Sequence, residues 1–342
     1  MTDTIADPFQ RRFLSVEIIV PKGIKKLNYQ TQQQETSELA GQRISLQNYR
    51  IDASVVSLGK ITAVSAGISI YNLPADLMRA LAGYGTMGVF NYTSDSASDI
   101  AAASKTVAVR LYTSPDTYDT LAQSGGTVAQ QTANQRQMIF RGSLQNCSIQ
   151  MDAVPDPFAF IQCNTLGAAQ LFPADALSYK GGIAASTIAQ QIAQSVGLTF
   201  INDGVTTVLQ NPCFHGDLKK QLRDLSEQAL FDYSTENGTL AIWPIGSHRS
   251  AASNAGYTTI NSNNGLIGYP QFNGVGVSFT TLYNPSIRFG DRIYLETDAP
   301  NVTGFYVVSR VEANLSQELP GGAWYSNVQA TFYKNPVGTA AL

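Results

Sequence analysis

Residues 268–333 hold the feature that most constrains the fold, a series of short apolar runs in which hydrophobic side chains alternate with small or polar ones. The run at 275–279 alternates Val, Val and Phe with Gly and Ser, and runs at 287–295 and 306–311 follow turns rich in Gly, Pro and Asn. A period of two places successive side chains on opposite faces of a strand. We therefore expect a small antiparallel barrel or sandwich here.

The N-terminal half carries the same strand pattern. Strands are predicted at 13–20, within 44–56 as one or two strands, and at 66–73, 89–93, 106–112, 138–151 and 158–164. A helix should begin near Pro74, with Leu77, Met78 and Leu81 on its apolar face and Gly83 at its end.

Two cysteines lie within these predicted strands, and two polar segments lie between them. Cys147 and Cys163 are expected on neighbouring strands as core residues, because a turn at 154–157 links the two segments. The segments 94–105 and 114–137, rich in Ser, Thr, Ala, Gln and Asp, are predicted to be long polar surface loops.

The period changes after a Gly- and Pro-rich boundary at 166–182, where helical spacing appears. Ser186 or Thr187 is expected to cap a first helix that ends at Gly197, and Asp217 to cap a second helix. Hairpins are predicted at 198–209 and at 231–243.

Composition limits the class of protein. The 342 residues suffice for two or three domains. Charged residues make up 14% of the chain, well below the roughly 25% of an average soluble protein, which favours a surface covered by neighbours in an assembly. A net charge of −3 argues against a protein that grips nucleic acid, although mild acidity suits a surface past which DNA slides.

The sequence carries no marks of secretion or membrane insertion. Its first residues lack the apolar region of a signal peptide, and no uninterrupted apolar stretch of about 20 residues is present. Three cysteines leave at least one unpaired and match no zinc spacing, so we expect free thiols and folding in a reducing cytoplasm.

Few residues qualify for chemistry. His215 is expected to serve a loop, and His248 to face solvent in a Gly- and Ser-rich connection. The carboxylates expected to face water beside strands and turns are those of Asp291, Glu296, Glu312 and Glu318. The prediction is therefore a protein that is not an enzyme, with no catalytic residue, no cofactor and no metal site.

Aromatic residues of the last third are the candidate functional residues. Packing inside a barrel or at a subunit interface is the expectation for aromatic side chains on alternating strand positions. The candidates for an interface or for barrel closure are Trp324, Tyr325, Tyr306, Phe289 and Tyr283. The alternative is a sugar-stacking platform of Trp324 beside Tyr325, with Tyr283 or Tyr306.

The order of turns and strands in this region carries a family resemblance. Asn-Pro at 284–285, Ile-Arg-Phe-Gly-Asp at 287–291, the run 304–311, and Pro-Gly-Gly-Ala-Trp at 320–324 follow one another. This order resembles the closing barrel of baseplate hub proteins of contractile-tailed bacteriophages. The Asn-Leu-Pro junction at 72–74 is similar to tail-tube domains, and 138–164 resembles the closing strands of the first hub barrel.

The resemblance spans about residues 13–333 and implies an architecture. It implies a mainly β fold with an α+β insert: a first tube-like antiparallel β-barrel with long polar loops at 1–165, a small helix-hairpin α/β insert at 166–245, and a second tube-like barrel at 246–342. The expected internal duplication is faint in the sequence, since Ile-Phe-Arg-Gly at 139–142 has only a loose echo in the second barrel.

The resemblance also implies a function. Such hubs form a homotrimeric ring that adapts the sixfold tail tube to the threefold central spike and lets DNA pass through its lumen without specific binding. The implied partners are the tail tube protein, the central spike protein, baseplate wedge proteins and the tape measure protein. The implied location is the tail baseplate of the virion, after assembly in the host cytoplasm.

Two other interpretations stay open. One is a carbohydrate-binding or cell-wall-degrading tail component, for which Trp324→Ala should abolish glycan binding; in a hub the same change should damage folding or trimerisation. The other is the spike-trunk protein of a contractile secretion system. An appended spike β-helix would favour it, and none is found in the sequence, where no lysozyme or peptidase domain is expected either.

Overall fold

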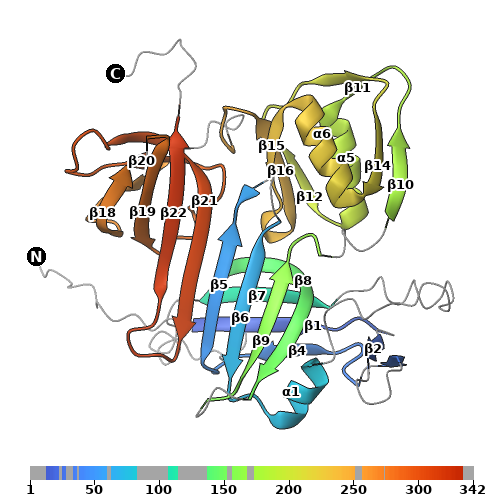
Figure 1. The fold of residues 1–342 in the computed structure, drawn as a ribbon, viewed down its shortest axis with the longest axis vertical. Coiled ribbons are helices and arrows are strands. Elements are labelled where there is room, and N and C mark those ends of the chain that lie inside the picture. The colour runs from blue at the N-terminus through green and yellow to red at the C-terminus, as the bar shows by residue number, and fades with distance from the viewer. Residues whose placement is uncertain are drawn as a thin grey trace, which may run out of the picture.

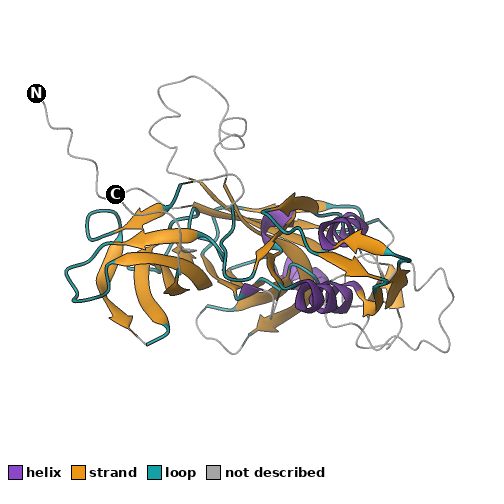
Figure 2. Cartoon of the chain, turned by 90° about the horizontal axis from the view of Figure 1, so that it is seen from above, coloured by secondary structure: helices purple, strands orange, loops and turns teal. Residues whose placement is uncertain are grey.

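The computed structural model describes residues 13–22, 25–27, 34–36, 38–59, 63–82, 107–114, 137–151, 156–167, 173–250, 256–272 and 274–333. The fold is mainly β, as predicted, with large antiparallel sheets. Figure 1 shows three parts, which we name the first unit (described residues within 13–167), the insert (173–245) and the second unit (256–333). In Figure 2 the helices lie toward one end of the molecule, with only strands and loops at the other.

The first unit is an antiparallel sheet with one short helix beside it. Alternating burial along its strands, such as Ile51, Ala53 and Val55 in β5, places one face in the core. Its elements are β1 (Phe13–Ile19), β2 (Lys25–Leu27), β3 (Gln34–Thr36), β4 (Arg43–Leu46), β5 (Ile51–Ser57), β6 (Ser65–Tyr71), α1 (Ala75–Leu81), β7 (Ala108–Ser114), β8 (Gln137–Gln150) and β9 (Phe158–Asn164).

The second unit contains only strands. Its elements are β17 (Thr258–Ile260), β18 (Leu266–Phe272), β19 (Gly276–Leu282), β20 (Arg292–Leu295), β21 (Gly304–Gln317) and β22 (Trp324–Phe332). The period of two in the sequence is confirmed here, since alternate residues of β21, from Tyr306 onward, are buried.

One sheet runs through both units. Among the described residues its 13 strands follow the path β18-β19-β22-β21-β5-β6-β9-β8-β7-β1-β4, with β17 and β20 branching from β21. The first part of β21 pairs with β20, and residues 311–317 pair antiparallel with β5. The change of partner follows a bulge between Val308 and Arg310. The two expected barrels are therefore joined by backbone hydrogen bonds (Figure 1).

The end of β21 also contacts the far side of the first unit. The Gln317 side chain is 1% exposed, and its Oε1 accepts a hydrogen bond from the backbone N–H of Leu14 in β1. β1 lies five strands from β5 along the sheet path, yet both strands contact β21. The sheet of the first unit must therefore curl strongly.

The insert places two helices against small sheets. Its elements are β10 (Pro173–Ser178), β11 (Gly182–Ala184), α5 (Ala185–Val196), β12 (Thr199–Asn202), β13 (Val208–Gln210), β14 (Cys213–Asp217), α6 (Leu218–Ala229), β15 (Phe231–Ser234), the 3-10 turn η3 (Glu236–Gly238) and β16 (Thr239–Pro244). Asp217 caps α6 as predicted, since its Oδ1 accepts a bond of 2.9 Å from the N–H of Lys220. Gly197 ends α5 with φ 74°. The hairpin of β15 and β16 is also confirmed.

Two predictions in the insert are wrong. The segment 198–209 is not a hairpin: β12 pairs parallel with β16, and β13 pairs with β11. The ladder along β16 continues into the turn, because Asp203 N–H donates to Ile242 O at 2.8 Å. Neither Ser186 nor Thr187 caps α5, which begins at Ala185 directly after β11. The N–H of Ala185 is satisfied by Thr207 O at 2.9 Å instead.

The other predictions in the first unit are confirmed or fall outside the described residues. The strands at 13–20, 44–56, 66–73, 106–112, 138–151 and 158–164 are present within a few residues, and α1 follows Pro74. Cys147 and Cys163 lie buried on the paired strands β8 and β9. The predicted strand at 89–93, the loop at 94–105, Gly83 and nearly all of the loop at 114–137 lie outside the described residues.

Three main apolar clusters match the three units, and the first contains residues from the far end of the chain. Ala313 and Leu315 of β21 are buried with β1, β5, β6, β7, β8 and β9 in the first cluster. A second cluster lies between the helices and sheets of the insert, and a third lies inside the second unit. The domain boundaries at 165 and 245 stay a prediction, although β21 contributes to two clusters.

We predict that Leu315→Ala and Leu295→Ala, two buried leucines from different clusters, loosen different units. Each change should cost about 2–5 kcal/mol of stability, because it leaves a cavity. Hydrogen exchange should quicken in β5 and β6 for Leu315→Ala and in β17 and β20 for Leu295→Ala. Identical exchange maps for the two variants would contradict the separation of the two cores.

Candidate functional site at the junction of the units

The carboxylate of Glu236 lies where the three units meet. Its Oε1 accepts a hydrogen bond of 2.6 Å from Ser57 Oγ at the end of β5, and its Oε2 accepts one of 2.8 Å from Arg249 Nη1. The side chains of Arg249 and Glu236 are only 6% and 10% exposed. One carboxylate in the η3 turn thus connects the first unit, the insert and the chain leading into the second unit.

The segment 246–250 is held in place at this junction. Arg249 N–H donates to Gly290 O at 2.7 Å, which ties the segment to the second unit. His248 is 7% exposed, so the prediction that it faces solvent is wrong. Its Nδ1 lies 2.8 Å from Arg249 O, and its ring packs edge-on against Tyr333 at 5.3 Å. A Gly- and Ser-rich composition indicates a loop but does not tell how deeply that loop is packed.

Phe289 packs against the insert and the first unit at once. Its ring lies 5.6 Å from that of Trp243, which is 1% exposed. A Cβ at Gly59 would lie 2.1 Å from Phe289 Cζ, and a Cβ at Gly290 would lie 2.3 Å from Trp243 Cζ2. Both glycines have positive φ, so backbone conformation and close approach require glycine at both positions.

Asp291 is the second carboxylate near the junction. The prediction that it faces water is wrong, since its side chain is 14% exposed. It accepts hydrogen bonds of 3.1 Å from both the backbone N–H and the Nε of Arg288. Burial raises the pKa of Asp291, while the charges of Arg288 and Arg249 oppose that rise.

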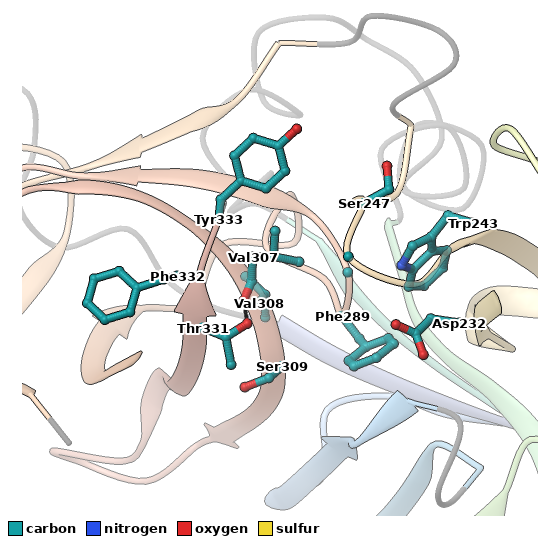
Figure 3. A pocket seen from close by; sticks show the side chains of 12 residues that line it. Asp232, Trp243, Ser247, Phe289, Val307, Val308, Ser309, Thr331, Phe332 and Tyr333 are labelled. Atoms are coloured by element: carbon teal, nitrogen blue, oxygen red, sulfur yellow. Dashed lines mark hydrogen bonds between the residues drawn. The ribbon is translucent and has the colours of Figure 1, made fainter. Parts of the chain in front are cut away.

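A cavity of about 150 Å³ opens beside these residues, between the insert and the second unit. Figure 3 shows Asp232 and Trp243 on one wall and Thr331, Phe332 and Tyr333 on the other. The volume suits a single side chain rather than a drug-sized ligand, for which pockets are larger.

The other predicted candidates lie in the second unit, Tyr306 in its own core and Tyr283 and Trp324 near its contact with the first unit. Tyr306 is 1% exposed, and its hydroxyl donates to Val302 O at 2.6 Å. Tyr283 and Trp324 meet edge-on at 6.0 Å, and both pack against the first apolar cluster. Tyr325 is half-buried in β22. Their assignment to an interface or to barrel closure stays a prediction.

The described residues contain no group of three or more His, Cys, Asp or Glu side chains able to hold a metal, and no helix among them has both the length and the apolar character to cross a bilayer. Burial raises the pKa of the Cys147 thiol to about 12, which leaves it an unreactive core residue.

Of the residues at this junction, only Phe289 was named from the sequence as a candidate for an interface or for barrel closure, and Ser57, Glu236, Trp243 and Arg249 were missed. Of these, Trp243 had a usable signal, because a buried tryptophan at the end of a predicted strand needs a packing partner. The pairing of Glu236 with Arg249 had no signal in the sequence, since the two residues lie in connecting segments without periodic spacing.

We predict that the buried pair is coupled. Glu236→Gln or Arg249→Met alone should cost about 3–5 kcal/mol, because each leaves a buried group without its partner. The double variant should cost clearly less than the sum, measured by urea unfolding. Arg223→Met is the control: its pair with Glu227 spans 3.9 Å with side chains 54% and 66% exposed, and the loss should stay below about 1 kcal/mol. A loss for Glu236→Gln no larger than for Arg223→Met would contradict the coupling.

We also predict different effects of alanine at two glycines with nearly equal φ, Gly290 (83°) and Gly246 (82°). Only at Gly290 would the new Cβ meet another side chain, that of Trp243, whereas no atom lies within 4 Å at Gly246. Gly290→Ala should lower the melting temperature well beyond Gly246→Ala, which reports backbone strain alone. Equal shifts in a thermal melt would exclude close packing at Trp243 as the cause.

The chain is similar to known proteins in sequence and in fold. The sequence matches the family model described as Baseplate hub gp41 over residues 42–318. No curated protein matches the chain by sequence. Among solved structures, the tail protein from Neisseria meningitidis MC58 superposes with a TM-score of 0.56 at 9% identity, covering 93% of this chain and 96% of that one.

A second solved structure is the E. coli c3393 protein, described as a component of the type VI secretion system with structural similarity to T4 bacteriophage tail proteins gp27 and gp5. It gives a TM-score of 0.51 at 7% identity, covering 86% of this chain and 76% of that one. At these identities the two likenesses show the fold alone. The family model, however, spans most of both β units and the whole insert, and the chain therefore belongs to the Baseplate hub gp41 family.

Proposed function

We propose that the chain is a structural hub of a phage baseplate, and that three copies form a ring between the sixfold tail tube and the threefold central spike. The observation that carries the proposal is the fusion of two β units into one hydrogen-bonded sheet through β5 and β21. Three such chains would present six β units around one axis. A threefold ring could then meet a sixfold partner with similar contacts at each position.

The surface of the second unit supports contacts with neighbours. Large apolar side chains are exposed along β18, β19 and β22 and just before β19: Ile267, Tyr269, Phe272, Val275, Leu282 and Phe332. Extended exposed apolar surface is typical of interaction sites. The low charge of the chain supports the same proposal, because charged residues are depleted where partners pack.

The remaining roles follow from the ring. Its partners would be the tube protein on one side, the spike protein on the other, and wedge proteins at the rim, with the tape measure protein and then DNA passing through the lumen. The hub would reside in the virion tail after assembly in the host cytoplasm. Its function would be assembly and passage, with no bond made or broken.

The environment of Trp324 supports packing over sugar binding. Its ring is half-buried and meets Tyr283 edge-on against the first apolar cluster. Tyr283 is itself partly buried against this cluster, and that burial raises the pKa of its hydroxyl. A ring engaged in this way does not offer both faces to a glycan.

We predict that the purified chain forms a species of about three chain masses in sedimentation velocity at increasing concentration, and that end-on electron micrographs show a central hole. Trp324→Ala should reduce both folding stability and this species. A compact monomer at every concentration, even with spike and tube proteins added, would contradict the ring. Glycan binding lost in Trp324→Ala without any loss of stability would favour the carbohydrate-binding alternative.

A further inference from the structure

Four residues form a mixed aromatic and cationic cluster on the second unit, which we name the Arg292 cluster: Tyr257, Arg292, Tyr294 and Phe305. Tyr257 precedes β17, Arg292 and Tyr294 occupy alternate positions of β20, and Phe305 lies opposite Tyr294 in β21. The Phe305 ring lies 4.9 Å from those of both Tyr257 and Tyr294. The guanidinium carbon of Arg292 lies 5.4 Å from the ring centres of Tyr257 and Phe305.

No carboxylate of the described residues lies beside the charge of Arg292. Among the described residues, Arg43, Arg249, Arg288 and Arg310 each have a carboxylate oxygen within 3.1 Å, whereas none lies within 4.0 Å of Arg292. Its Nε is buried and has no acceptor within the described part of the chain. Aromatic faces attract a guanidinium but accept none of its hydrogen bonds in the way a carboxylate does. The cation is therefore partly removed from water without a matching anion.

The cluster is accessible from outside and adjoins the cavity at the junction. Tyr257 is 46% exposed and Phe305 is 39% exposed. Tyr333 connects the two features, since its ring lies 5.9 Å from the Arg292 guanidinium and it also lines the cavity. Arginine flanked by tyrosine and other aromatic residues is the composition typical of the energetic centres of protein interfaces.

We propose that the Arg292 cluster is a docking site for an acidic side chain, Asp or Glu, of another protein of the tail. The rings hold the guanidinium plane and shield it from solvent, so an incoming carboxylate meets a positioned cation and forms charge-assisted bonds to its terminal nitrogens. A neutral partner would leave the charge unpaired and gain less. The kind of partner rests on the proposed function, but the carboxylate chemistry rests on the cluster alone.

The test measures binding of acetyl-tetraglutamate amide and its neutral counterpart, acetyl-tetraglutamine amide, to the full chain by calorimetry at low ionic strength. We expect saturable binding of the acidic peptide only, and a loss of affinity of about tenfold or more in Arg292→Gln, because one charge-assisted pair is removed. Arg79→Gln is the control, since Arg79 is 78% exposed and lies far from the cluster in sequence, on α1. Circular dichroism confirms that each variant is folded.

Three results would overturn the docking site: no saturable binding of the acidic peptide, unchanged affinity in Arg292→Gln, or an equal loss in Arg79→Gln. If a neutral oligosaccharide binds the chain, and this binding is lost in Tyr257→Ala but kept in Arg292→Gln, the cluster is a glycan site instead. Sedimentation of Arg292→Gln separates this inference from the proposed function. If Arg292→Gln forms the ring and still binds the peptide normally, the docking site alone is refuted. If the unmodified chain binds the peptide but never forms a ring, the hub alone is refuted.

Discussion

The pairing of β21 with β5 is the interaction on which the rest of the structure depends. At about 3.3 Å per residue, the 14 residues of β21 span roughly 45 Å, long enough to serve two cores in succession. Its first part lies against β20 and its last part against β5, so backbone hydrogen bonds join the two β units directly. Side chains of the same strand reinforce the connection, because Ala313 and Leu315 are buried in the core of the first unit.

The junction around Glu236 then fixes the insert relative to this sheet. A buried ion pair adds little net stability over an apolar pair of the same shape, because both charges lose their water. The geometry of the junction is demanding, however. Glu236 must accept hydrogen bonds from Ser57 and Arg249 at the same time. Phe289 must also fit between Trp243 and Gly59. These contacts together restrict how the three units can be arranged, because each requires a particular side chain at a particular distance.

The sequence allowed most strands to be predicted because a period of two is local. Ile51, Ala53 and Val55 indicate the buried face of their strand without reference to any partner strand. Asp217 likewise indicates the start of a helix from the local sequence alone. Pairing between distant strands has no such local signal, so the junction of the two β units through β21 could not be predicted. The hairpin at 198–209 failed for the same reason, since Thr199–Asn202 finds its partner in β16 rather than in the next strand. His248 and Asp291 were misplaced because burial of a loop depends on what folds over it.

The shared strand also bears on how the protein is made. The ribosome synthesises β5 well before β21, so the first unit emerges with one edge of its sheet unpaired. That edge stays open to other strands until β21 arrives, and pairing across such a separation is slow. Completion of the first unit is thereby tied to synthesis of the second unit, and a chain that ended before β21 would retain an unpaired strand edge.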